Sequence, residues 1–252
     1  MLYPVLLCTC AGLSTAMGGL FVALSGNVDN RKMSFSQGFA AGVMVTVSLA
    51  DLMKESFLNY YTYMPALMAA KAVLSLFFCG WIAGGAFNSF TDTGKIKGEN
   101  ENIYTARRMA FITTAVMVVH NLPEGMLTMF TSAENLSFGF EIALAVALHN
   151  FPEGMAIASP VLYVTGSRRK AVGQSFLAGM AEPAGGILAY LLLSDFVSRA
   201  FLNGLIPVIA GIMCQASVCE MIPAGARLSN IKHTICGIIA GTAIMSIGLM
   251  AF

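Results

Sequence analysis

The chain has 252 residues, of which 57% are hydrophobic and 11% are charged, and its formal net charge at pH 7 is +1. Soluble domains normally carry about 25% charged residues, so this composition excludes a water-soluble globular protein. The apolar stretches run for about twenty residues without alternating, which favours membrane-spanning helices over a β-barrel. We expect membrane lipid around the protein and no nucleic-acid partner.

Eight apolar segments are long enough to cross a hydrocarbon core of about 30 Å. In chain order they cover residues 2–25, 35–56, 64–88, 107–130, 139–163, 170–194, 202–224 and 233–252. The connections between them are short, and the longest, 91–106, is predicted to be a flexible loop. We therefore predict an all-α polytopic membrane protein with one transmembrane domain over residues 1–252 and no appended soluble domain.

Basic residues gather in alternate connections, which predicts the orientation in the membrane. The odd-numbered connections and their flanks hold eleven of the fourteen Lys and Arg residues: Arg31, Lys32, Lys95, Lys97, Arg107, Arg108, Arg168, Arg169, Lys170, Arg227 and Lys232. Because cytoplasmic loops of membrane proteins are enriched in Lys and Arg, these connections are predicted to be cytoplasmic. Both termini then lie on the extracytoplasmic side of the cell membrane.

The first three segments resemble the last three. The matching stretches are AGLSTAMGGLFVA at 11–23 with AGMAEPAGGILAY at 178–190, AGVMVTVSLADLM at 41–53 with AGIMCQASVCEMI at 210–222, and IAGGA at 82–86 with IAGTA at 239–243. Each matched segment comes five spans after its partner, and successive spans run in opposite directions, so this odd offset means that the second copy must be inverted in the membrane. This predicts a 3+2+3 arrangement: a first repeat in 1–88, two central helices in 107–165, and an inverted repeat in 170–252. Inverted repeats are typical of transporters, although shared small-residue packing motifs also produce such matches.

The two central segments carry the same polar motif, VVHNLPEGM at 118–126 and ALHNFPEGM at 147–155. Its His and Glu are four residues apart, so they share one face of a helix with Cβ atoms about 5–6 Å apart. The candidate metal ligands are His120, Asn121, Glu124, His149, Asn150 and Glu153. Nitrogen and oxygen ligands of this kind suit zinc, iron, manganese or cobalt, and the residues leave that choice open.

Glu182 in the sixth segment is a further candidate ligand, because its repeat partner is Thr15 and the fold alone does not require a charge there. An acidic residue at the centre of a membrane helix costs about 2.5–3.5 kcal/mol. No Lys or Arg lies nearby in these segments to neutralise Glu124, Glu153 and Glu182. A bound dication, or protons in its absence, would compensate, so metal binding is predicted to release protons and to weaken at low pH.

Helix-breaking and small residues accompany the motif. Pro123 and Pro152 each remove one backbone hydrogen bond and are predicted to kink their helices, opening space beside the ligands. Gly125 and Gly154 are predicted to let neighbouring helices approach closely.

Two acidic residues at helix ends, Asp51 and Glu220, are repeat mates. Inversion places Asp51 toward the outside and Glu220 toward the cytoplasm, which suggests an entrance and an exit for the ion. Solvated helix ends explain both residues equally well.

The motifs HNLPEG at 120–125, HNFPEG at 149–154 and AEPAGG at 181–186 resemble the signature of the ZIP (Zrt/Irt-like) family of divalent metal transporters, most closely its compact bacterial zinc-uptake branch. The resemblance extends over essentially the whole chain. It implies uptake of zinc, with iron, manganese, cobalt and cadmium as further candidates, into the cytoplasm by alternating access. The metal is then a transported substrate rather than a cofactor, and the protein can form a homodimer.

The resemblance also implies a binuclear site. His120, Glu124, His149 and Glu153 would hold one metal ion. Asn121, Asn150 and Glu182 would hold the other, with Glu124 and Glu153 bridging the two.

Two other classes of function compete with transport. An intramembrane zinc-dependent hydrolase would usually carry a general base such as the Glu of HExxH, and no HExxH occurs in the sequence. Haem-based electron transfer through His120 and His149 would place three carboxylates beside the haem. We therefore predict that the protein is not an enzyme.

Overall fold

The structure is a computed structural model that describes residues 2–89, 100–193 and 198–251. Within these ranges every regular element is a helix, which confirms the all-α prediction. The elements are α1 (Leu2–Leu24), α2 (Asn30–Thr46), η1 (Val47–Leu52), α3 (Met53–Tyr61), α4 (Ala66–Ser89), α5 (Glu101–Glu134), α6 (Leu136–Thr165), α7 (Arg168–Gly179), α8 (Ala181–Leu193), α9 (Arg199–Ala216), η2 (Ser217–Met221), α10 (Ile222–Leu228) and α11 (Ile231–Ala251). Residues 91–99 of the loop predicted at 91–106 lie outside the described residues, and these include Lys95 and Lys97. For 101–106 the loop prediction was wrong, because these residues form the first turns of α5.

The helices α5 and α6 extend beyond the apolar segments predicted for them at both ends. Their ends are set by capping residues, which hydropathy does not report. The Asn100 side chain accepts a hydrogen bond from the backbone N–H of Asn102 at the start of α5. Asn135 caps α6 in the same way, and Gly166, in the left-handed conformation, ends it.

Three of the predicted helices are interrupted. The elements η1 and η2 are π-helical segments, and they lie at corresponding positions of the repeat stretches 41–53 and 210–222. A break at Met180 separates α7 from α8. Pro183 lies three residues after the break, lacks a backbone N–H for the carbonyl of Gly179 and so favours an interruption at this point. None of these interruptions is predicted by the hydropathy pattern or the repeat.

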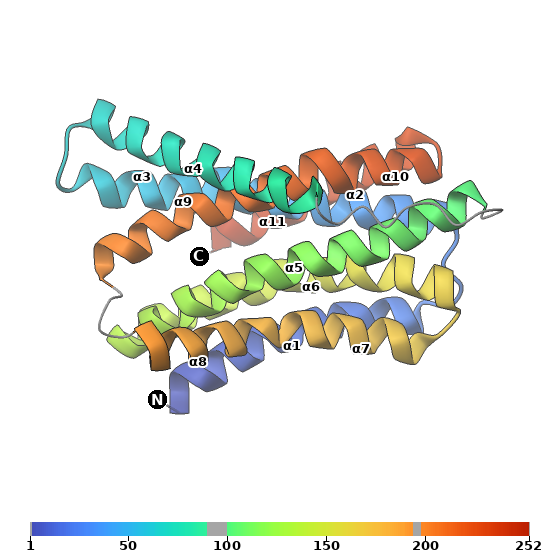
Figure 1. Cartoon of the computed structure of the whole chain (residues 1–252), viewed down its shortest axis with the longest axis horizontal. Helices are drawn as coiled ribbons and strands as arrows, with labels where there is room; N and C mark the ends of the chain where they lie inside the picture. The colour runs from blue at the N-terminus through green and yellow to red at the C-terminus, as the bar shows by residue number, and fades with distance from the viewer. Residues whose placement is uncertain (1, 90–99, 194–197, 252) are drawn as a thin grey trace.

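The helices form two groups, visible in Figure 1 as a lower and an upper layer. In the lower layer α1 packs on α6 and α7, and α5 packs on α6 and α8. In the upper layer α2 packs on α11, and α4 packs on α9. The layers meet chiefly where α2 contacts α6 and α9 contacts α5. The two central helices therefore lie at the junction between the groups.

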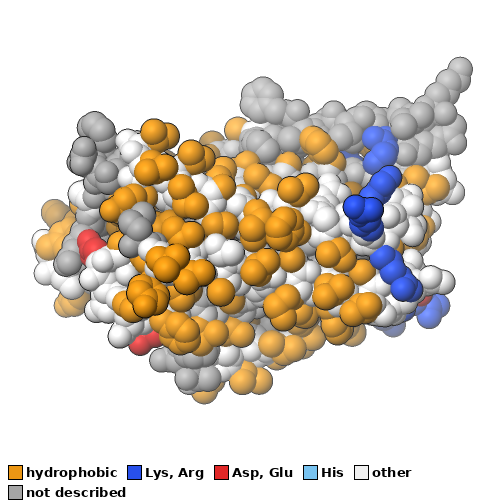
Figure 2. Space-filling model, turned by 90° about the horizontal axis from the view of Figure 1, so that it is seen from below, with side chains coloured by type: hydrophobic (Ala, Val, Ile, Leu, Met, Phe, Trp, Pro, Cys, Tyr) orange, Lys and Arg blue, Asp and Glu red, His pale blue; other side chains and the backbone are white. Residues whose placement is uncertain are grey.

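Six helical runs of the described chain are long and apolar enough to cross a membrane: Leu2–Leu24, Asn30–Tyr61, Ala66–Ala86, Arg168–Leu192, Ala200–Leu228 and Ile231–Met250. The helices α5 and α6 are not among them, because the polar motif residues and flanking charges lower their hydropathy. One face of the molecule is covered by hydrophobic side chains, with Lys and Arg gathered at one end and acidic residues at the other (Figure 2). This surface is that of a polytopic integral membrane protein.

Candidate metal centre

The predicted ligands of helices α5, α6 and α8 are deeply buried. Each of these seven residues is at most 4% exposed. They are His120, Asn121, Glu124, His149, Asn150, Glu153 and Glu182. The motif residues lie near the middle of the long helices α5 and α6, and Glu182 lies in the first turn of α8. Polar groups buried this deeply require partners, and the partners define the geometry of the site.

The imidazoles and carboxylates pair between the helices rather than along them. His120 Nε2 of α5 lies 3.1 Å from Glu153 Oε1 of α6. His149 Nε2 of α6 lies 3.3 Å from Glu124 Oε1 of α5. The two His–Glu pairs are therefore reciprocal, and they bring all four side chains to the contact between α5 and α6.

One ring nitrogen of His120 is fixed by the backbone. His120 Nδ1 lies 3.0 Å from the carbonyl oxygen of Val116, one turn earlier on α5. Because a carbonyl oxygen only accepts, Nδ1 carries the proton and donates to it. The other nitrogen, Nε2, is left facing Glu153 and is the one available to a metal ion.

The two motif asparagines are held symmetrically. The Asn121 amide group donates to the carbonyl oxygen of Ala178 at 3.1 Å. The Asn150 amide donates to that of Ala11 at 3.1 Å and also to Glu182 Oε2 at 2.8 Å. Ala11 and Ala178 occupy the same position in the repeat stretches 11–23 and 178–190. Each asparagine thereby directs its amide nitrogen to a neighbouring helix and leaves its oxygen free.

Several buried oxygen atoms around the site have no hydrogen-bond partner. They are Asn121 Oδ1, Asn150 Oδ1, Glu124 Oε2, Glu153 Oε2 and Glu182 Oε1. An unsatisfied buried acceptor is costly, and a carboxylate more so than an amide. Together these atoms form a set of oxygen donors suited to a divalent cation.

The side chains are not preformed as a metal cage. Among the described residues, no group of three or more His, Cys, Asp or Glu side chains is arranged to hold a metal ion. The reciprocal pairing accounts for this, because each imidazole faces a carboxylate. A metal ion would have to displace these pairs.

Glycines bring the backbones together around the site. A β-carbon on Gly125 would collide with the carbonyl oxygen of Glu182, and one on Gly154 with that of Thr15. Glu182 and Thr15 are themselves repeat mates. The close approach predicted for the motif glycines is therefore seen in the structure. The helices α5 and α6 continue through Pro123 and Pro152 without interruption.

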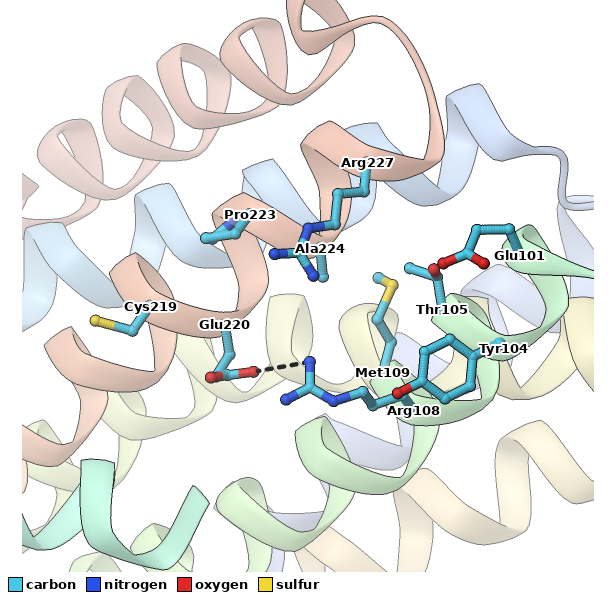
Figure 3. Close-up of a pocket in the computed structure, with 10 residues that line it drawn as sticks. All are labelled: Glu101, Tyr104, Thr105, Arg108, Met109, Cys219, Glu220, Pro223, Ala224 and Arg227. Carbon is cyan, nitrogen blue, oxygen red and sulfur yellow. Dashed lines mark ion pairs between the residues drawn. The ribbon is translucent and has the colours of Figure 1, made fainter. Parts of the chain in front are cut away.

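Asp51 and Glu220 lie in different cavities. Asp51 lines a cavity of about 30 Å³ together with Glu124 and His149. Glu220 lines a separate cavity of about 320 Å³ whose wall contains none of the predicted ligands (Figure 3). There Glu220 Oε2 lies 3.7 Å from Arg108 Nη1 of α5. The structure thus brings Asp51 to the candidate centre and keeps Glu220 apart from it.

Glu55 was missed by the sequence analysis. It lines the small cavity beside Asp51, Glu124 and His149. Its spacing of four residues from Asp51, the same as that of the His and Glu in each motif, was the available signal. Glu55 has an uncharged residue, Ala224, at the corresponding repeat position, so the repeat comparison did not single it out.

The chain matches known proteins over nearly its whole length. Residues 85–248 match the family model described as ZIP Zinc transporter. The chain is 35% identical to a protein of Chlorobium phaeovibrioides named Zinc transporter ZupT, covering 99% of this chain and 98% of the relative. Proteins with the same name from Stenotrophomonas maltophilia and Salmonella heidelberg are each 34% identical, with coverage of 96% and 99% of this chain and of 93% and 97% of the relatives.

These relatives are transporters and not enzymes, which agrees with the prediction that the chain has no catalytic activity. The doubled motif, the helices that carry it and the relatives all lead to one assignment: the chain belongs to the ZIP family of zinc transporters.

Proposed function

We propose that this protein carries divalent metal ions, with zinc as the principal substrate, across the cell membrane into the cytoplasm. The observation that carries the proposal is the buried ligand set between α5 and α6, in which two imidazoles are paired with carboxylates and further oxygen atoms have no partner. Membrane-buried ionisable groups of this kind mark ion pathways. The zinc-transporter names of relatives similar over nearly the whole chain give the same substrate.

In this proposal the site holds two metal ions. His120, Glu124, His149 and Glu153 bind one of them through nitrogen and carboxylate oxygen atoms. The second ion is bound by the free oxygen atoms of Asn121, Asn150 and Glu182, with Glu124 and Glu153 bridging. The unpartnered second oxygen of each bridging carboxylate supports that role. The protons held by the His–Glu pairs leave when metal binds.

The proposed architecture is eight membrane-spanning helices in a 3+2+3 arrangement, with α5 and α6 as the central pair. The packing supports an inverted repeat. In the repeat, α2 corresponds to α9, and α11 corresponds to α4. The contact of α2 with α11 in the structure therefore has a counterpart in the contact of α9 with α4, and both contacts are extensive. The matched π-helical segments η1 and η2 and the matched asparagine contacts to Ala11 and Ala178 follow the same symmetry. The buried polar motif of α5 and α6 is compatible with membrane depth because it faces protein rather than lipid.

Alternating access is proposed to occur by movement of the lower layer against the upper layer. In the structure the candidate centre adjoins the cavity on the Asp51 side. On the Glu220 side, the buried residues Ile112, Val116 and Ala216 form a cluster. Two of them, Ile112 and Val116, lie along α5 between Met109, which lines the cavity of Figure 3, and His120 of the centre. This arrangement corresponds to a state in which the ion can enter from the outside while the cytoplasmic path is closed. Both termini are extracytoplasmic in this orientation.

The proposal is tested by radioactive zinc uptake into proteoliposomes containing the purified protein. Glu124→Ala and His149→Ala should each abolish uptake, because each removes one ligand and leaves its partner buried alone. Glu141→Gln is the control, since Glu141 is exposed and lines a different groove with Tyr3 and Phe140. Zinc uptake that survives both ligand substitutions would refute the assigned site, and wild-type vesicles that accumulate no zinc would refute the transport function.

A further inference from the structure

Two cavities on the Asp51 side of the molecule adjoin one another. The larger, of about 600 Å³, is lined by residues of α3, α5, α6 and α9 and includes the exposed residues Thr62, Tyr63 and Asn135. The smaller, of about 30 Å³, is lined by Glu124 and His149 of the candidate centre. Only Glu55 and Leu127 are common to the described linings of both cavities. A route from the surface to the centre through these two cavities would pass Glu55, which is the charged residue that the two described linings share.

Glu55 is well placed to contact an ion on that route. It is half-buried in α3, four residues after Asp51, and both carboxylates line the small cavity. The lining also includes Glu124 and His149, and each of them has a deeply buried atom without a hydrogen-bond partner, Glu124 Oε2 and His149 Nδ1. No Lys or Arg is among the described residues that line either cavity, and the neighbouring Lys54 is exposed. The negative charge at the junction is therefore not neutralised by a basic residue of the cavity walls.

The size of the small cavity restricts what can pass. A cavity needs roughly 10–15 Å³ of such volume to hold one water molecule, so about 30 Å³ has no room for an ion with its full hydration shell. An ion moving inward must exchange water for protein ligands at this point. Carboxylate oxygens are suitable replacements for a divalent cation.

We propose that Glu55, together with Asp51, forms a transient outer binding site that takes a divalent cation from the larger cavity, replaces part of its hydration shell and passes it to Glu124 and His149. This inference rests on the proposed transport function and adds a ligand residue to it. Glu55 is the gateway ligand, and Asp51 supports it from the preceding turn.

The test compares zinc uptake kinetics of wild type, Glu55→Gln, Glu55→Asp, Asp51→Asn and Glu141→Gln in proteoliposomes. Glu55→Gln keeps the size of the side chain and removes its charge. We expect it to lower kcat/KM about tenfold, mainly through a higher KM, because clefts lined with one sign of charge raise association rates by about 10–10³-fold. Glu55→Asp should restore most of the loss, and Asp51→Asn should show a smaller effect of the same kind.

The Glu141→Gln control separates a local site from general surface charge. It removes one exposed carboxylate elsewhere and should leave KM unchanged. Equal effects of Glu55→Gln and Glu141→Gln, or failure of Glu55→Asp to restore activity, would refute the outer site.

A direct binding measurement supplements the kinetics. Cadmium binding by the purified full-length protein, followed by equilibrium dialysis, should show a weaker class of sites that Glu55→Gln removes while the tight class remains. Unchanged cadmium binding and uptake in Glu55→Gln would overturn the inference while wild-type zinc uptake still upheld the transport function. Absence of wild-type uptake would instead overturn the function itself.

Discussion

Replacing Gly125 with alanine tests whether close backbone contact holds the candidate centre together. An added β-carbon would lie 2.5 Å from the carbonyl carbon and 2.9 Å from the Cα of Glu182, closer than real Cβ contacts. These are backbone atoms, so no side-chain rotation relieves the clash, and α5 and α8 must separate. The displaced segment carries Glu182, whose Oε2 accepts the 2.8 Å hydrogen bond from Asn150.

The magnitude follows from two opposing terms. Overpacking a tight contact costs about 1–3 kcal/mol, whereas alanine in place of glycine in a helix contributes up to about 1 kcal/mol of stability. The net loss of about 0–2 kcal/mol corresponds to a fall in Tm of up to about 4 °C for a chain of this size, at about 2 °C per kcal/mol. Zinc uptake should fall as well, because Glu182 moves away from Asn150.

The control is Gly173→Ala in α7. A β-carbon there meets no atom within 4 Å, so only the favourable helix term remains. Tm is measured by thermal unfolding in detergent, and uptake with radioactive zinc in proteoliposomes. The reasoning is refuted if Gly125→Ala is as stable as Gly173→Ala and transports zinc at the wild-type rate.

Three further outcomes are expected. Zinc affinity, measured by equilibrium dialysis between about pH 5 and pH 8, should rise with pH because His and Glu ligands must lose protons to bind metal; a pH-independent affinity would contradict the assigned ligands. Arg108→Gln removes the 3.7 Å ion pair with Glu220, which lies on the side proposed to be cytoplasmic. Since partly exposed pairs contribute about 0–1 kcal/mol, the zinc uptake rate should rise by at most about fivefold; a complete loss of uptake would assign Arg108 a different role. Asn150→Leu should lower Tm more than Asn121→Leu, because Asn150 donates to both Ala11 O and Glu182 Oε2 whereas Asn121 donates only to Ala178 O. The second acceptor left without a donor adds a cost of about 1–3 kcal/mol, and equal Tm values would contradict the observed hydrogen bonds.

The sequence predicted those features that depend on residue type and spacing. The length and composition of the apolar segments indicated an all-helical membrane protein, and the repeated HNxPEG motif indicated the family. The motif spacing also placed His120 and Glu124 on one side of α5, and the structure brings both to the contact with α6. The crosswise pairing could not be predicted, because four-residue spacing equally permits pairing within each helix.

Other features depend on contacts between distant segments. The π-helical segments have no known residue signature, and the break at Met180 required Pro183 to be considered against the carbonyl of Gly179 rather than as part of a ligand motif. Glu55 acquires significance only when the fold brings α3 to a cavity that α5 and α6 also line. The orientation of the termini and the entrance and exit roles of Asp51 and Glu220 stay predictions.

The crosswise His–Glu pairing has a consequence for how this site can change during evolution. Each imidazole is paired with a carboxylate of the other helix. Replacing one member of a pair therefore leaves the other member buried without its partner. A viable change in ligand chemistry must then alter both members of a pair together, His120 with Glu153 or His149 with Glu124. Homologues that differ at these positions should therefore have substitutions at both residues of a pair, one on each helix, rather than at a single residue.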